Sequence, residues 1–285
     1  MFAFADMVHL FSDEFASLGG GSFALACISS GSCYCVLLWH NQSSPCSNKG
    51  HGWHLANGGK HPAFAVAVRR GIGFFSGRML KTEFYQAEEK DSRRLILVMH
   101  GLGDSIEGYR WVPAMMRLPW LNYILVNAPD PYFGGYSWYD FSGDAGPGIA
   151  RSRKMLFELL DLLREKAFPT EQTIVCGFSQ GCLMTWEGGL YYPHRFAGLV
   201  GISGYVFQHE QVAKRMSPVA KEQKFLITHG TFDQLVPFED VRKQVQFMKQ
   251  LGLQIEWREF QKAHTIAGDE EVDVIREFIQ KCNNR

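Results

Sequence analysis

Short apolar runs alternate with longer amphipathic stretches along the second part of the chain. The apolar runs predict strands at 95–99, 123–126, 173–176, 198–202, 225–228 and 255–260. Some of these runs are apolar at almost every position, which is typical of parallel strands buried on both faces. The amphipathic stretches predict helices at 149–166, 182–191, 238–251 and 270–282. The pattern therefore predicts an α/β fold with a mostly parallel central sheet and helices on both faces.

The first 78 residues differ from the rest of the chain in composition. They hold only 8 charged side chains against 50 in the remainder, together with 11 of the 29 glycines and four of the seven cysteines. They show no sustained helical or alternating period. We therefore divide the chain into an N-terminal extension of uncertain structure at 1–78, which is unstructured, loosely packed or not part of the natural product, and a folded domain at 79–285.

Charge and hydropathy exclude several classes of protein. The net charge is zero, which argues against the broad basic surface of a nucleic-acid-binding domain. The apolar stretch at 23–39 is interrupted by serines and glycine, and no basic residue precedes Lys49, so neither a secretory signal nor a transmembrane segment is predicted. The three cysteines of the second part are too dispersed for a disulfide framework, and we expect a cytoplasmic location.

A group of cysteines and histidines in the extension raises the question of a metal site. Its members are Cys33, Cys35, Cys46, His51 and His54. Their spacing lacks the paired C-x-x-C pattern that makes zinc predictions specific. We expect no bound metal.

The sequence GFSQG at 177–181 follows the predicted strand at 173–176 and precedes a predicted helix. A G-x-S-x-G turn between a strand and a helix exposes its serine beyond the strand end. The glycines are required because the sharp turn leaves no room for neighbouring Cβ atoms. This context predicts that Ser179 is a nucleophile.

A serine nucleophile needs a base, and the base needs a carboxylate that orients it. With the chain order serine, acid, histidine, the preferred acid is Asp233, in the loop that leaves the strand at 225–228. Glu239 and Asp240 compete, but they lie in a first helical turn, where acidic residues commonly complement the helix dipole.

His264 is the histidine that follows the last predicted strand, which makes it the preferred base. We expect His194 to act as a surface cap and His229 to form a structural hydrogen bond near the acid loop. A lone histidine is usually structural, but His264 completes the order with Ser179 and Asp233. The predicted triad is therefore Ser179, Asp233 and His264.

Acyl transfer through a serine also needs two N–H donors for the oxyanion. The residue after the nucleophile, Gln180, is expected to supply one backbone N–H. The loop HGLGD at 100–104 follows the strand at 95–99, and its glycines allow close approach of the main chain. We assign the second donor to Leu102.

Together these motifs resemble the phospholipase/carboxylesterase family, which includes the acyl-protein thioesterases. The resemblance rests on HGLGD, SWYD at 137–140, GFSQG, D-x-L-V-P at 233–237 and the late His264, and it covers residues 95–270. It implies an α/β-hydrolase fold, no cofactor, and hydrolysis of a small-molecule ester or acyl substrate through an acyl-enzyme. We expect a monomer or a homodimer.

Two departures from the family pattern bear on the substrate. Cys182 stands where the family often has a second glycine, and 261–263 read QKA where many thioesterases have a glycine or methionine run. They favour a carboxylesterase for short- to medium-chain acyl groups over an acyl-protein thioesterase or lysophospholipase. A peptidase would use the same chemistry, but no feature of the chain indicates one. A non-catalytic ligand-binding protein of this fold is the remaining alternative, and it predicts loss of a triad member, whereas all three are present.

The connection at 129–146 carries six aromatic residues that could line an apolar acyl pocket. The alternative is that some of them pack beneath the loop as core. We predict that Trp138 and, from the acid loop, Leu235 contact the substrate.

Overall fold

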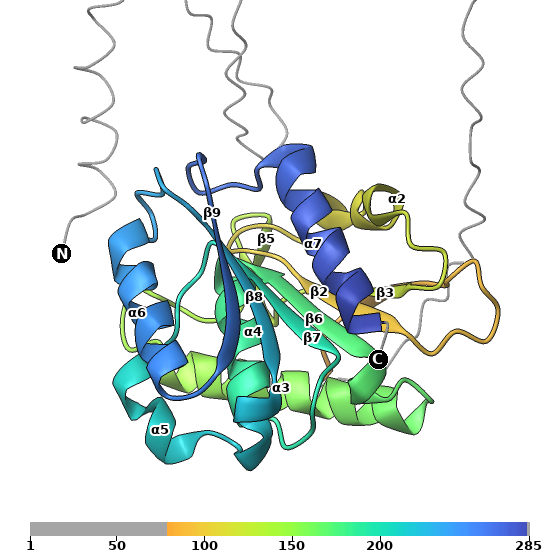
Figure 1. The fold of residues 1–285 in the computed structure, drawn as a ribbon, viewed down its shortest axis with the longest axis horizontal. Coiled ribbons are helices and arrows are strands. Elements are labelled where there is room, and N and C mark those ends of the chain that lie inside the picture. Colours follow the sequence, from red (N-terminus) through yellow and green to blue (C-terminus); the bar gives the residue numbers. More distant parts are fainter. Residues whose placement is uncertain (1–78, 284–285) are drawn as a thin grey trace, which may run out of the picture. The chain divides into compact units, whose positions relative to one another are not determined.

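The computed structural model of the protein describes residues 79–283, which contain one seven-stranded sheet (Figure 1). The strand order is β1-β3-β2-β6-β7-β8-β9, and each neighbouring pair is parallel except β1 with β3. The predicted mostly parallel sheet is confirmed. The strands are β1 Thr82–Tyr85, β2 Leu95–Met99, β3 Asn122–Val126, β6 Thr173–Phe178, β7 Gly198–Ile202, β8 Lys224–Gly230 and β9 Gln254–Phe260.

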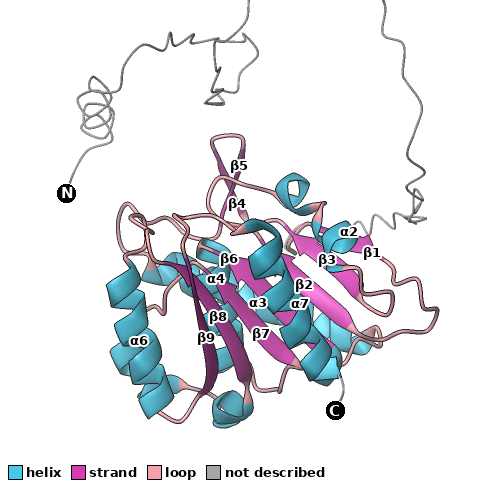
Figure 2. Ribbon diagram, turned by 45° about the horizontal axis from the view of Figure 1, so that its top comes forward, coloured by secondary structure: helices cyan, strands magenta, loops and turns pink. Residues whose placement is uncertain are grey.

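The central strands are buried on both faces because helices cover each side of the sheet (Figures 1 and 2). In β2, Leu95 and Leu97 join the core beneath one set of helices, while Ile96 and Val98 join the core on the opposite face. Successive side chains of a strand point to opposite faces, so a strand between two cores must be apolar throughout. This is why the predicted strands at 95–99 and 198–202 match β2 and β7 residue for residue.

Helices α3, α4 and α6 contribute to one core, and α2 and α7 contribute to the other (Figure 1). In α3 the buried face is made by Leu156, Leu159, Leu160 and Leu163, at the spacing that predicted this helix. The helices are α2 Val112–Met116, α3 Gly146–Glu165, α4 Gln180–Tyr191, α5 Val212–Arg215, α6 Phe238–Gln250 and α7 Gly268–Asn283. The four predicted helices therefore exist, with ends that differ from the prediction by at most three residues.

The sequence pattern missed the edge strand β1 and a small hairpin, β4 Asp130–Tyr132 with β5 Gly135–Ser137. The hairpin turns through Phe133 and Gly134, both with positive φ (41° and 91°), and it stands apart from the main sheet in Figure 2. Phenylalanine rarely adopts positive φ, so no turn was predicted there. β5 also pairs with the loop after β2, where Gly103 donates to the Tyr136 carbonyl at 2.9 Å and Tyr136 donates to the Asp104 carbonyl at 3.0 Å.

The predicted extension at 1–78 and its Cys and His group lie outside the described residues, so the division near residue 79 stays a prediction. Among residues 79–283, no helix combines the length and the apolar character that crossing a bilayer requires. The same residues contain no cluster of three or more potential metal-ligating side chains.

A partly buried ion pair joins α4 to α3. The Glu187 carboxylate is almost completely buried and accepts a hydrogen bond from the Arg153 guanidinium at 2.8 Å. Burial raises the pKa of Glu187 to about 7, although Arg153 acts in the opposite direction. Glu187 therefore binds a proton in the folded protein at pH values where it has lost it in the unfolded chain.

We predict that Glu187→Gln changes how stability depends on pH. Below pH 4.5 the raised pKa of Glu187 adds on the order of 3 kcal/mol to the free energy of unfolding. This contribution is lost as the pH rises to about 7. Glutamine does not titrate. The difference in Tm, variant minus wild type, should become more positive from pH 5 to pH 8 in thermal unfolding. A difference that is constant over this range would contradict the assignment.

Candidate active site

The three residues of the predicted triad lie in loops at one edge of the sheet. Ser179 follows β6, Asp233 follows β8, and His264 follows β9. These strands are parallel to one another, so their carboxyl ends meet at the same edge. Residues separated by 85 positions in the chain are thereby brought into hydrogen-bonding distance.

Ser179 occupies a strained turn between β6 and α4, with φ 55° and ψ −115°. The turn is possible because glycines flank it: a Cβ on Gly177 would lie 2.1 Å from the Gly181 carbonyl oxygen, and a Cβ on Gly181 would lie 2.3 Å from the Met99 carbonyl oxygen. The Ser179 N–H donates to the Ile202 carbonyl at 2.9 Å. Backbone contacts on both sides therefore hold the serine in this conformation.

A continuous hydrogen-bonded chain joins the three side chains. His264 Nδ1 lies 2.8 Å from Asp233 Oδ2, and His264 Nε2 lies 2.8 Å from Ser179 Oγ. Because a carboxylate can only accept, Nδ1 carries the proton and donates to Asp233, which leaves Nε2 to accept the serine O–H. The Phe178 ring packs against the imidazole with centroids 5.0 Å apart.

The Asp233 side chain is fully buried and each of its oxygens has a defined partner. Oδ1 accepts the backbone N–H groups of Leu235 at 3.0 Å and Val236 at 2.9 Å, so Oδ2 is directed to His264. Glu239 and Asp240 instead lie in the first turn of α6. Of the three acidic candidates, Asp233 is the one whose carboxylate contacts His264.

His229 is a structural neighbour of this chain. Its side chain is buried, and Nε2 donates to the Val236 carbonyl at 2.8 Å while lying 3.5 Å from Asp233 Oδ2. Burial lowers the pKa of His229 and keeps the imidazole neutral. The prediction that His229 supports the acid loop is confirmed.

The loop that carries Leu102 lies against the nucleophile. A Cβ on Gly101 would be 3.2 Å from Ser179 Cβ and 3.0 Å from the Phe178 ring, so any larger residue would make tight contacts that require these side chains to shift. Within residues 79–283, neither the Leu102 N–H nor the Gln180 N–H donates to another protein group. Both predicted oxyanion donors therefore remain available for a ligand.

The His100 side chain stabilises this loop through hydrogen bonds to the main chain. Its buried ring accepts the Ala128 N–H at Nε2 (3.0 Å), so Nδ1 carries the proton and donates to the Gly101 carbonyl at 2.6 Å. Burial lowers the pKa of His100 and so favours the neutral ring, while the two hydrogen bonds determine its tautomer. The histidine of the HGLGD motif thus holds the loop backbone in place.

Trp138 does not lie where we predicted. It is completely buried, and its indole N–H donates to the His100 carbonyl at 2.9 Å, so it packs beneath the loop as the alternative interpretation stated. The Gln180 side chain fixes the same segment, accepting the Trp138 N–H at 2.9 Å and donating to the Tyr139 carbonyl at 2.9 Å. The hydrophobic pattern of the sequence does not indicate that the Gln180 side chain has this supporting role. Leu235, by contrast, is 71% exposed beside Asp233, and its contact with a substrate stays a prediction.

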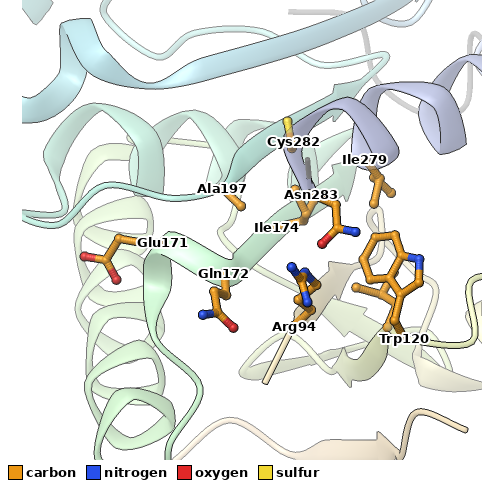
Figure 3. Close-up of a pocket in the computed structure, with 10 residues that line it drawn as sticks. Arg94, Trp120, Glu171, Gln172, Ile174, Ala197, Ile279, Cys282 and Asn283 are labelled. Carbon is orange, nitrogen blue, oxygen red and sulfur yellow. The ribbon is translucent and has the colours of Figure 1, made fainter. Parts of the chain in front are cut away.

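A pocket of about 70 Å³ is lined by residues outside the predicted triad and oxyanion loop (Figure 3). Its lining residues lie just before or at the start of strands β2, β3, β6 and β7 or near the end of α7, and include Arg94, Trp120, Gln172 and Asn283. This places the pocket at the amino ends of the parallel strands. It is therefore separate from the Ser179 edge.

Comparison with known proteins agrees with this geometry. The phospholipase/carboxylesterase family matches residues 80–283. Acyl-protein thioesterase 1 of Schizosaccharomyces pombe is 33% identical over 159 residues, covering 50% of this chain and 69% of that protein. An acyl-protein thioesterase 1 homolog of Dictyostelium discoideum is 28% identical over 225 residues, covering 71% and 96%.

Solved structures share the fold. The crystal structure of esterase PE8 matches with a TM-score of 0.65 at 23% identity, covering 72% of this chain and 99% of that one. Acyl-protein thioesterase 2 of Zea mays matches with a TM-score of 0.60 at 21% identity, covering 71% and 98%. The predicted α/β-hydrolase fold is thereby confirmed.

We predict that Gly181→Ala lowers the free energy of unfolding by about 2 kcal/mol or more, because the added Cβ meets a backbone oxygen that cannot rotate away. Gly188→Ala is the matched control in the same helix, where a Cβ would meet only the end of the Leu156 side chain at 3.8 Å. This control should be neutral or stabilising by up to about 1 kcal/mol. Urea denaturation measures both, and equal effects would contradict the steric account.

Proposed function

The chain belongs to the phospholipase/carboxylesterase family of carboxylic ester hydrolases, and we propose that Ser179, His264 and Asp233 are its catalytic triad. The observation that carries the proposal is the chain of two 2.8 Å contacts from Asp233 through His264 to Ser179 Oγ. In this arrangement the base contacts the nucleophile through one nitrogen and its orienting carboxylate through the other.

The reaction begins when Ser179 Oγ attacks the carbonyl carbon of the ester and His264 Nε2 takes the hydroxyl proton. The Leu102 and Gln180 N–H groups donate to the oxygen that becomes negative in the tetrahedral intermediate. His264 then gives its proton to the leaving alcohol, and an acyl-enzyme on Ser179 remains. In the second half, His264 takes a proton from a water molecule, which attacks the acyl carbon. His264 then returns the proton to Ser179 Oγ, and the carboxylic acid is released.

Asp233 stabilises the imidazolium that forms in each half of the reaction. Its carboxylate is held by the Leu235 and Val236 N–H groups, so it is oriented before the substrate binds. A fixed acceptor needs no reorganisation when the charge on His264 develops.

The proposed substrates are carboxylic esters with short- to medium-chain acyl groups. Leu235 and Phe232 flank Asp233 in the chain and are 71% and 64% exposed, which offers apolar surface beside the acid loop. In the connection at 129–146, Trp138 and Tyr139 are buried, while Phe133 and Phe141 are exposed. Part of the aromatic connection thus remains available to an apolar ligand.

Thioester hydrolysis is the second candidate, favoured by relatives named acyl-protein thioesterase in Schizosaccharomyces pombe and Dictyostelium discoideum. The same triad would serve, because the acyl-enzyme is identical and only the leaving group changes from an alcohol to a thiol.

We predict that Ser179→Ala lowers kcat for p-nitrophenyl butyrate by at least about 10³-fold, because the nucleophile is lost. Ser142→Ala removes an exposed serine that hydrogen-bonds only to Asp140, and it should retain the wild-type rate. A Ser179→Ala protein with more than a tenth of wild-type kcat would refute the assignment.

The preferred substrate is tested by comparing kcat/KM of the full chain for p-nitrophenyl esters from acetate to palmitate with that for an S-acylated peptide. The proposal expects a maximum at short or medium acyl length and a lower value for the thioester. A higher kcat/KM for the acylated peptide than for every simple ester would favour the thioesterase instead.

A further inference from the structure

A buried ion pair lies directly beneath the loop that carries His264. Lys262 Nζ contacts both carboxylate oxygens of Glu271, at 2.6 and 2.7 Å. Lys262 is 5% exposed and Glu271 is fully buried. Lysine and glutamate are rarely buried to this extent, so the pair needs an explanation beyond surface charge.

The Glu271 carboxylate binds the loop on both sides of His264. It accepts the Lys262 ammonium, two residues before the histidine, and the Ala267 N–H at 2.7 Å, three residues after it. Glu271 belongs to the regular helix α7, whereas the residues between Phe260 and Gly268 form no regular element. A rigid helix thus holds both ends of an irregular loop, with the imidazole between them.

The Lys262 backbone also reaches the acid loop. Its carbonyl accepts the Phe232 N–H at 3.1 Å, and a Cβ on Gly230 would lie 2.2 Å from the same oxygen. One residue therefore contacts the acid loop through its main chain and α7 through its side chain. Lys262 therefore links the acid loop, α7 and the loop that carries His264.

Stability alone does not account for this pair. Moving two charges out of water costs desolvation free energy, and a well-packed apolar pair in the same volume is commonly as stable or more stable. The ion pair instead fixes the position of the Lys262 side chain, because the ammonium makes two short contacts to one carboxylate. An apolar contact would not fix the side chain in one position. Phe260 adds a second constraint, with Lys262 Nζ 5.8 Å from its ring centroid.

We propose that Lys262 and Glu271 are positioning residues that hold His264 in reach of both Asp233 and Ser179. Neither side chain touches the reacting atoms. The inference rests on the proposed triad for its catalytic consequence, but its geometric consequence, the His264–Asp233 hydrogen bond, can be measured without any substrate.

The test compares the full-length wild type with the double variant Lys262→Met/Glu271→Leu, which replaces the pair by apolar side chains and leaves no buried charge unpaired. We expect an unchanged or raised Tm, an unchanged KM and a 10- to 100-fold lower kcat for p-nitrophenyl butyrate, since misplacement by about 1 Å can cost this much. A kcat within twofold of wild type at equal Tm would overturn the proposal.

A single variant and an NMR signal provide two further tests of the proposal. If the double variant does not fold, Glu271→Gln is used, because it removes the ion pair but keeps an acceptor for the Ala267 N–H. It should lower kcat at least fivefold with KM unchanged. A wild-type kcat in this variant would overturn the proposal. Glu187→Gln is the control, because it breaks a partly buried ion pair between α3 and α4 that makes no hydrogen bond to the loop carrying His264, and it should keep wild-type kcat.

The second readout is the far-downfield proton NMR signal of His264 Nδ1–H, assigned by its loss in His264→Ala. It should be present in the wild type and broadened or lost in the double variant. A wild type that hydrolyses no ester but shows this change would refute the proposed function and leave the positioning role standing. An unchanged signal would refute the positioning role.

Discussion

The site depends on how closely three backbone segments approach one another around Ser179. β6 and α4 meet at Gly177 and Gly181, and the loop after β2 contacts the same turn through Gly101. None of these positions accepts a Cβ without a collision or a tight contact. The strained serine conformation is therefore a consequence of packing, and the segments that carry Leu102 and Gln180 approach each other at this turn.

Around this turn, buried polar side chains restrict the loops that carry the chemistry. His100 and Trp138 hold the backbone of the loop after β2, and Gln180 holds the segment that contains Trp138. On the other side, Lys262 joins the acid loop to the histidine loop. Buried polar groups of this kind are costly when unpaired, so each of these contacts resists displacement of the loop that it supports.

Much of this arrangement could be predicted from the sequence because it follows from local rules. Continuously apolar strands such as β2 reveal burial on both faces, and Ser179, Asp233 and His264 each follow a strand in the expected chain order. The hairpin at Phe133 could not be predicted, because it is stabilised by pairing with a distant loop rather than by its own turn residues. Trp138 was misplaced because an aromatic in a loop looks the same in sequence whether it faces a ligand or the core. Lys262 was noted only as a departure from a family pattern, since its partner Glu271 is indistinguishable in sequence from its acidic neighbours in the first turn of α7.

The central claim is that Ser179 is a nucleophile activated by His264, and covalent labelling tests it most directly. The full chain is treated with an alkyl fluorophosphonate, which reacts with activated serines, and the modified peptide is identified by mass spectrometry. The account predicts a single adduct on Ser179 and much slower labelling in His264→Ala. An adduct on another residue, or equal labelling rates with and without His264, would contradict it.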